Sequence, residues 1–338
     1  MAAAISLRRS SCRLLLTRFH NSATLAGQRG GATTTTTTRW LETIAYEELR
    51  AHPEKPYTST AFFIHGFLGS SRNWRSFSRN LLASLSNSSL SSNWRTVMVD
   101  MRNHGKSAER KLDPPHDMEN AAKDLADLVK AEGWRWPEVV IGHSMGGKVA
   151  LQFLQSCSRG EYGDSALCPK QLWVLDSVPG EVNPLNSNEE VRDVLRTLQS
   201  LPSRIPSRKW LVNHLLGLGY SKALSDWIGT NLKKVDDHET WVFDLQNAQQ
   251  MFDSYWEKSY WNLLENPPKG TEIIIVRAEK SDRWDEDAVE RIQKLANREA
   301  TESLGKVSFS LLPNSGHWVH VDNPKGLLEI LAPKISSL

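Results

Sequence analysis

The sequence has 338 residues, of which 39% are hydrophobic and 24% charged, and its net charge at pH 7 is +2. This length and composition are typical of a folded domain with an inserted subdomain, and they argue against a disordered or collagen-like chain. No uninterrupted run of about 18 apolar residues occurs, which argues against a helix that spans a membrane.

The charge is distributed unevenly along the chain. Residues 1–39 hold six Arg and no acidic residue, so the remainder has a net charge of −4. A slightly acidic body lacks the basic face that binding to phosphates requires, and we therefore expect no nucleic-acid partner. Cys12, Cys157 and Cys168 are too few and too scattered for a disulfide framework or a zinc site.

Residues 1–38 have the composition of an organelle transit peptide. They are rich in Arg, Ser and Thr, lack acids, and end in a run of threonines at 33–38. Apolar residues between Ile5 and Phe19 are interleaved with arginines, a pattern that can form the basic amphipathic helix recognised in mitochondrial import. We expect a disordered leader and a mitochondrial protein, with the plastid as the alternative. A disordered tail without a targeting role is the other interpretation.

From residue 40 onward, short apolar runs rich in β-forming residues alternate with helical patterns. This alternation predicts an α/β fold with a mostly parallel sheet and crossover helices. Several of the predicted strands are continuously apolar, as strands buried on both faces are. The six predicted strands cover residues 60–65, 96–100, 139–142, 172–176, 272–276 and 308–312.

Two helices have recognisable start signals. Asp117 is a predicted N-cap for a helix whose apolar face includes Leu125 and which ends at Gly133. Asn323 followed by Pro324 predicts the cap and the first position of a closing helix.

The strand pattern disappears between about residues 180 and 265, where the sequence predicts several helices. We interpret this segment as a helical lid inserted into a domain of residues 39–338. Most of its tryptophans are expected to pack the lid, and some to line a pocket. These tryptophans are Trp210, Trp227, Trp241, Trp256 and Trp261.

The segment GHSMG at 142–146 fits the pattern G-x-S-x-G and lies between a predicted strand and a helical run. In this context the serine stands on a sharp strand-to-helix turn, where glycines avoid a collision between Cβ and the neighbouring backbone. The N-terminus of the following helix favours a developing oxyanion. Ser144 is therefore the predicted nucleophile of an acyl transfer. Serine at this position excludes a nucleophilic Asp of the dehalogenase type.

A serine nucleophile needs a base, and His317 is the best candidate. It lies in the loop directly after the last predicted strand, which gives the chain order Ser, acid, His. The alternative interpretation is a surface loop histidine. His320, three residues further on, is expected to serve packing or helix entry.

The acid that orients the base has two candidates. Asp282 follows the penultimate predicted strand, which is the common place for this carboxylate, and Asp176 ends the strand before it. Either one is also suited to capping a loop.

The segment HGF at 65–67 closes the first strand of the body, where Gly66 allows close approach of the backbone. We assign the oxyanion hole to the backbone N–H groups of Phe67 and Met145. His65 and His143 are expected to be hydrogen-bonding scaffold rather than catalysts.

Two further patterns argue against other chemistries. The segment GKS at 105–107 resembles the end of a P-loop, but Asp100 stands where that motif requires glycine. The ten histidines show no H-E-x-x-H spacing. We therefore expect no nucleotide, metal or other cofactor, and we expect Asp100 and its neighbours to brace the adjacent loops.

Four segments together resemble one branch of the alpha/beta-hydrolase superfamily. They are HGF at 65–67, DMRNHG at 100–105, GHSMGGK at 142–148 and GHW at 316–318. The branch contains alpha/beta-hydrolase domain-containing protein eleven and bacterial short-chain acyl esterases, and the similarity runs from about residue 58 to the C-terminus.

This resemblance implies an alpha/beta-hydrolase fold and a cofactor-free hydrolase whose substrate is a small-molecule acyl ester or thioester, with the acyl group left open. In that branch the acid belongs to an Asp-x-x-Pro segment, which residues 176–179 match, whereas the loop around Asp282 departs from the family pattern. The resemblance therefore favours Asp176 and keeps Asp282 as the alternative. Two other hypotheses use the same fold: cleavage of C–C bonds or lyase chemistry, and a non-enzymatic receptor for a small ligand.

Overall fold

The structure, a computed structural model, describes residues 8–9, 42–88, 93–182, 189–299 and 301–338. The expected leader lies outside these ranges except for Arg8–Arg9 (β1), which pair antiparallel with Tyr46–Arg50 (β2). At these two residues the backbone is extended, so the expected amphipathic helix does not include them.

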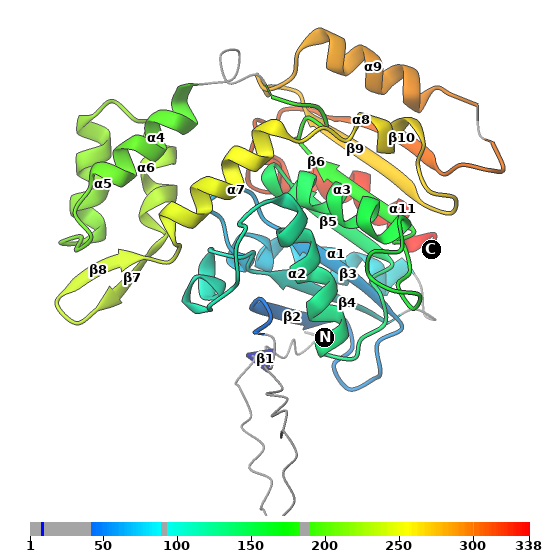
Figure 1. Cartoon of the computed structure of the whole chain (residues 1–338), viewed down its shortest axis with the longest axis horizontal. Helices are drawn as coiled ribbons and strands as arrows, with labels where there is room; N and C mark the ends of the chain where they lie inside the picture. Colours follow the sequence, from blue (N-terminus) through cyan, green and yellow to red (C-terminus); the bar gives the residue numbers. More distant parts are fainter. Residues whose placement is uncertain (1–7, 10–41, 89–92, 183–188, 300) are drawn as a thin grey trace, which may run out of the picture.

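An eight-stranded sheet forms the centre of the molecule, in the order β1-β2-β4-β3-β5-β6-β9-β10 (Figure 1). Strand β2 runs antiparallel to both of its neighbours, and the remaining pairs are parallel. All six predicted strands are confirmed, whereas the antiparallel strand β2 was not predicted. The parallel strands are β3 (Ser59–Ile64), β4 (Trp94–Val99), β5 (Val139–His143), β6 (Gln171–Leu175), β9 (Glu272–Ala278) and β10 (Lys306–Leu312).

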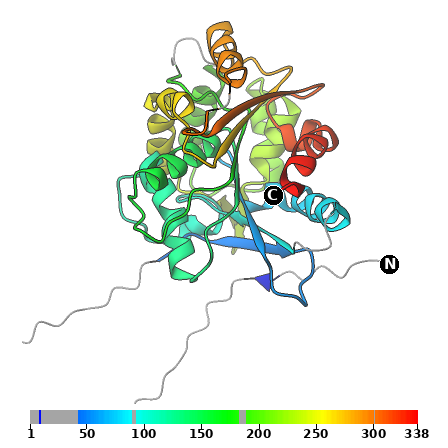
Figure 2. The same ribbon diagram turned by 90° about the vertical axis from the view of Figure 1, so that its right-hand side faces the viewer.

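Helices cover both faces of the sheet (Figure 2). Alternate side chains of β3 enter different layers, because successive residues of a strand point to opposite faces. Phe62 and Ile64 belong to one apolar core, and Ala61 and Phe63 to the other. The first core includes α2 (Met118–Ala131), α3 (Met145–Ser158) and α9 (Glu286–Ala296), and the second includes α1 (Arg75–Ser88) and α11 (Pro324–Ser336).

The predicted caps are confirmed at two helices. The Asp117 side chain accepts a hydrogen bond from the Asn120 backbone N–H at the start of α2, and Gly133 has φ +63° just beyond its end. Asn323 caps α11 through the Gly326 backbone N–H, and Pro324 occupies the first turn. The described chain also contains the 3₁₀ helices η1 (Ser71–Trp74) and η2 (Gly105–Glu109) and the short helix α10 (Val319–Asp322).

The inserted segment, interpreted above as a lid and called the lid below, projects from one side of the molecule over residues 189–241 (Figure 1). The expectation of helices alone was wrong for residues 232–241, which form an antiparallel hairpin of β7 and β8. These strands are short and half exposed, so they lack the apolar runs by which the central strands are recognised. The elements of this segment are α4 (Glu189–Ser200), α5 (Arg208–Gly217), α6 (Lys222–Gly229), β7 (Leu232–Val235), β8 (His238–Trp241), α7 (Leu245–Glu257) and α8 (Trp261–Glu265).

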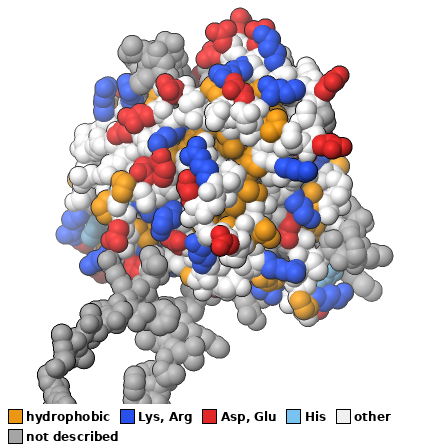
Figure 3. Space-filling model, turned by 45° about the vertical axis from the view of Figure 1, so that its right-hand side comes forward, with side chains coloured by type: hydrophobic (Ala, Val, Ile, Leu, Met, Phe, Trp, Pro, Cys, Tyr) orange, Lys and Arg blue, Asp and Glu red, His pale blue; other side chains and the backbone are white. Residues whose placement is uncertain are grey.

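Within the ranges described, no helix combines the length and apolar character needed to cross a membrane. On the face seen in Figure 3, basic and acidic side chains are interspersed, with hydrophobic side chains between them.

The loop after β4 is held by the polar side chains of the DMRNHG segment. Asp100 accepts hydrogen bonds from the backbone N–H groups of Ser71 (2.6 Å) and Lys106 (3.0 Å). The buried guanidinium of Arg102 forms a two-pronged ion pair with Asp124 of α2, at 2.7 and 2.8 Å. These contacts agree with the expected bracing role.

We predict that Asp124→Ala lowers the free energy of unfolding by about 3–5 kcal/mol, because it leaves the buried Arg102 charge without its partner. Asp127→Ala on the same helix removes only an exposed ion pair with Lys123, and it should cost at most about 0.5 kcal/mol. Urea unfolding of both variants measures the difference. Similar losses for the two variants would contradict the bracing role of the buried pair.

Candidate active site

Ser144 lies at a sharp bend between β5 and α3. Its backbone has φ 53° and ψ −122°, and its N–H donates to the Leu175 carbonyl at 2.9 Å. A Cβ on Gly142 would stand 2.0 Å from the Gly146 carbonyl oxygen, and a Cβ on Gly146 would stand 2.5 Å from the His65 carbonyl oxygen. Only glycine fits at these two positions, so the G-x-S-x-G pattern follows from the lack of space at the bend.

His317 and Asp176 meet at the same edge of the sheet. His317 lies in the loop after β10, and its Nδ1 donates to Asp176 Oδ2 at 2.7 Å. Asp176 follows β6 and is completely buried. Its other oxygen, Oδ1, accepts from the Trp284 indole N–H at 2.8 Å and from the Ala278 backbone N–H at 3.1 Å. With Nδ1 engaged in this way, Nε2 of His317 is the nitrogen able to accept a proton.

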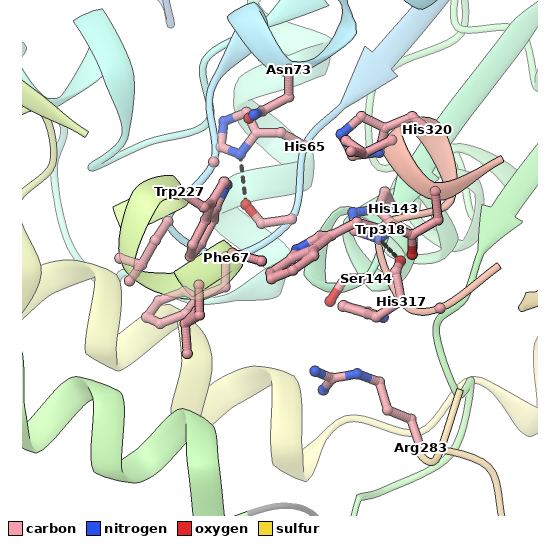
Figure 4. Close-up of a pocket in the computed structure, with 18 of the residues that line it drawn as sticks. His65, Phe67, Asn73, His143, Ser144, Trp227, Arg283, His317, Trp318 and His320 are labelled. Carbon is pink, nitrogen blue, oxygen red and sulfur yellow. Dashed lines mark hydrogen bonds between the residues drawn. The ribbon is translucent and has the colours of Figure 1, made fainter. Parts of the chain in front are cut away.

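Ser144 and His317 line one cavity of about 600 Å³ beneath the lid. Figure 4 shows the two side chains in neighbouring positions. Apolar side chains form much of the wall, and the loop after β9 contributes the charged residues Asp282 and Arg283. The principal apolar residues are Phe67, Leu68, Val194, Leu224, Trp227, Phe252 and Trp318.

The predicted oxyanion donors belong to neighbouring parts of this site. Phe67 follows β3 and lines the cavity, and Met145 opens α3 directly after Ser144. The end of β3 and the start of α3 are in close contact, as the lack of space at Gly146 shows. Within the described part of the chain, neither backbone N–H donates a hydrogen bond to another backbone group. Both therefore remain able to donate to a ligand.

Residues 61–330 match the family model described as "Alpha/beta hydrolase family". The chain belongs to the alpha/beta hydrolase family. Among curated proteins, it is 24% identical over 270 residues to "sn-1-specific diacylglycerol lipase ABHD11" of Mus musculus, covering 79% of this chain and 78% of that one. It is 27% identical over 297 residues to "Probable protein phosphatase methylesterase 1" of Caenorhabditis elegans, covering 82% and 71%.

The structure of this hydrolase also resembles solved structures of the same fold. A "Marine microorganism esterase" superposes with a TM-score of 0.66 at 19% identity, covering 85% of this chain and 97% of that chain. The fold and the family resemblance drawn from the four motifs are thereby confirmed.

Burial has the largest influence on the protonation of His317 and lowers its pKa. The hydrogen bond and the charge of Asp176 raise that pKa, and the positive charge of Arg283 lowers it, so that the net shift is downward. Burial raises the pKa of Asp176, but the hydrogen bonds from His317 and Trp284 outweigh this effect and hold it below its usual value. At neutral pH the hydrolase therefore pairs a neutral imidazole with an ionised carboxylate.

Three other histidines around the site have structural partners. His65 accepts from the Met101 backbone N–H at 3.0 Å, and His143 donates to the His317 carbonyl at 2.7 Å. The ring of His320 packs on Trp74, with 4.5 Å between the ring centroids. Burial lowers the pKa of His65 and of His320 to about 4, so both are neutral at physiological pH.

The two candidate acids occupy different positions. The Nδ1 hydrogen bond of His317 is made to the buried Asp176, whereas Asp282 is exposed on the wall of the cavity. Sequence reasoning alone left both open because each follows a strand that ends at this edge of the sheet.

Sequence reasoning assigned no role to Trp284 or to Lys148. The buried Lys148 of α3 donates to the carbonyls of Gly180 (2.7 Å), Tyr255 (2.6 Å) and Lys258 (2.8 Å), and so connects α3 to both ends of the lid segment. Burial lowers its pKa to about 7. A lysine in the otherwise apolar start of a helix was the available signal, whereas a contact such as that of Trp284 with Asp176 has no local signature.

We predict that Trp284→Phe destabilises the protein more than Trp256→Phe does, by about 1.5–3 kcal/mol, the usual contribution of a hydrogen bond to a charged group. The two tryptophans are equally buried, at 8% exposure, and both substitutions remove the same part of the ring. Only Trp284 donates to Asp176. Chemical unfolding of both variants tests this, and equal losses would show that the indole N–H has no special role.

Proposed function

We propose that this hydrolase cleaves carboxylic esters or thioesters, with Ser144 as nucleophile, His317 as base and Asp176 as the orienting acid. One observation carries the proposal. The imidazole of His317, which lines the same cavity as Ser144, is hydrogen-bonded through Nδ1 to the completely buried carboxylate of Asp176. This arrangement fixes the tautomer in which Nε2 can accept the proton of a serine hydroxyl.

The first half of the reaction forms an acyl-enzyme. Ser144 Oγ attacks the carbonyl carbon while His317 Nε2 takes its proton, and the resulting imidazolium is stabilised by Asp176. The negative charge on the carbonyl oxygen is stabilised by the backbone N–H groups of Phe67 and Met145. The carbon–oxygen or carbon–sulfur bond then breaks, and His317 returns the proton to the leaving group.

Water completes the reaction. It attacks the acyl carbon as His317 removes one of its protons, and the bond to Ser144 Oγ breaks as the serine regains its hydrogen. The products are an acid and an alcohol or thiol, and no cofactor takes part. The names of the relatives support the bond type, since they include a lipase, a methylesterase and an esterase.

We predict that Asp176→Asn lowers kcat on p-nitrophenyl esters by up to about 10⁴-fold, by analogy with the orienting aspartate of other serine triads. Ser144→Ala should abolish the acyl-enzyme burst. Asp282→Asn is the matched control, because it makes the same chemical change on the wall of the same cavity, and its effect should be far smaller.

Rate measurements on esters of graded acyl length compare these variants. The assignment of the acid is wrong if Asp176→Asn keeps the wild-type rate while Asp282→Asn loses it. A lack of turnover over the whole series would instead favour C–C cleavage or ligand binding as the function.

A further inference from the structure

Arg283 is a cationic side chain inside the cavity that contains Ser144. It lies in the loop after β9, next to Trp284, whose indole N–H donates to Asp176. The same loop is anchored at its other end, where the Lys280 backbone N–H donates to the Ser315 carbonyl at 2.9 Å. Arg283 lines the cavity, and Figure 4 shows its guanidinium extending toward Ser144 and His317.

The guanidinium of Arg283 is only partly satisfied by the protein. Its Nε is buried and has no hydrogen-bond partner among the described residues. The guanidiniums of Arg95 and Arg102 are also buried, but each forms an ion pair, with Glu48 and Asp124. One nitrogen of Arg95, Nη2, likewise has no hydrogen-bond partner among the described residues. Leaving a buried N–H donor without a hydrogen bond is unfavourable, so the Arg283 donor beside the cavity points to an acceptor supplied by a ligand. The positive charge of the guanidinium favours an anionic acceptor.

The positive charge of Arg283 acts on the site although two acidic residues also stand on the cavity wall. Asp282 and Asp322 both line the cavity, and both are exposed to solvent, where screening is strong. The charge of Arg283 still reaches the reacting groups. Burial is the largest cause of the lowered pKa of His317, and the charge of Arg283 also lowers that pKa. Burial raises the pKa of Tyr255, and the charge of Arg283 opposes this rise.

The rest of the cavity is suited to apolar groups. Leu224 and Trp227 of the lid and Phe67 of the loop after β3 lie along it. In the view of Figure 4, Trp227 and Arg283 lie on different sides of Ser144. A substrate that fills this space therefore has an apolar part on one side of the scissile carbonyl and an anionic group on the other.

We propose that Arg283 binds a carboxylate of the substrate, so that the enzyme prefers esters or thioesters that carry a carboxylate a few atoms from the scissile carbonyl. This inference rests on the proposed esterase function. A planar guanidinium matches the two oxygens of a carboxylate and orients it through parallel hydrogen bonds. Arg283 is thus a specificity-determining residue that contacts the substrate.

Two pairs of esters test the preference and locate the carboxylate. Monomethyl glutarate carries it on the acyl side, and its control is the methyl ester of glutaramic acid, in which a neutral amide of the same shape replaces it. Acetoxyacetate carries it on the leaving-group side, with acetoxyacetamide as its control. For at least one pair, wild-type kcat/KM should be about tenfold or more higher for the carboxylate, as expected for a charge-assisted hydrogen bond.

Substitution of Arg283 should remove this preference. We expect Arg283→Gln to lower the carboxylate-to-amide ratio of kcat/KM by about 10- to 100-fold, mainly through KM, and Arg283→Lys to restore part of it. Arg135→Gln is the matched control, because Arg135 is exposed and lies outside the cavity. Arg283→Gln should also move the acid limb of the pH profile to higher pH, since a charge that lowers the pKa of His317 is lost.

The preference is refuted if wild type treats both members of each pair alike, or if Arg283→Gln slows carboxylate and amide to the same extent. If neither these four esters nor the p-nitrophenyl series is cleaved, the proposed function fails, and Arg283 is tested separately by calorimetry. If only the p-nitrophenyl esters are cleaved, the preference for a carboxylate is refuted and the proposed function stands. Monomethyl glutarate should bind the Ser144→Ala variant at least about tenfold more tightly than it binds Ser144→Ala/Arg283→Gln. Equal affinities would overturn the assignment of Arg283.

Discussion

The sharp bend between β5 and α3 is the constraint on which the rest of the site depends. Backbone atoms approach so closely there that Gly142 and Gly146 have no room for a side chain, and Ser144 adopts a positive φ of 53°. The bend is held by the hydrogen bond from the Ser144 N–H to the end of β6. It raises the serine above the sheet edge and leaves the first N–H groups of α3 beside it.

The parallel sheet brings the other groups to the same edge. Strands β5, β6, β9 and β10 are consecutive neighbours, and their carboxyl ends carry Ser144, Asp176, the loop with Arg283 and Trp284, and His317. Residues 144 and 317 are far apart in sequence, yet they line one cavity because strands of the same direction end side by side. The lid closes this edge with an apolar wall and is tied to α3 through Lys148.

Burial and hydrogen bonding act in opposite directions on the charged groups of the site. Burial alone would favour a neutral Asp176, but hydrogen bonds from His317 and Trp284 stabilise its ionised form. Burial keeps His317 neutral, which is the form that can accept a proton. The low-dielectric surroundings of the site therefore hold the buried carboxylate of Asp176 and the neutral base His317 close together, with the positive charge of Arg283 nearby.

Much of the fold could be predicted from the sequence because its signals are local. The central strands are continuously apolar, Asp117 and Asn323 are good caps, and the glycines around Ser144 mark the bend. The hairpin at 232–241 escaped prediction because its strands are short and half exposed. The residues alone could not choose between Asp176 and Asp282, or reveal Trp284 and Arg283, because these depend on contacts between distant segments.

The reactivity of one hydroxyl group tests the central claim most directly. Folded protein is treated with a fluorophosphonate, and the modified residue is mapped by mass spectrometry in wild type and in His317→Ala. If His317 activates Ser144, wild type carries the label on Ser144 at one equivalent per chain, and the variant reacts far more slowly. A label on another residue, or equal labelling of both proteins, would contradict the proposed pairing of this serine with this histidine.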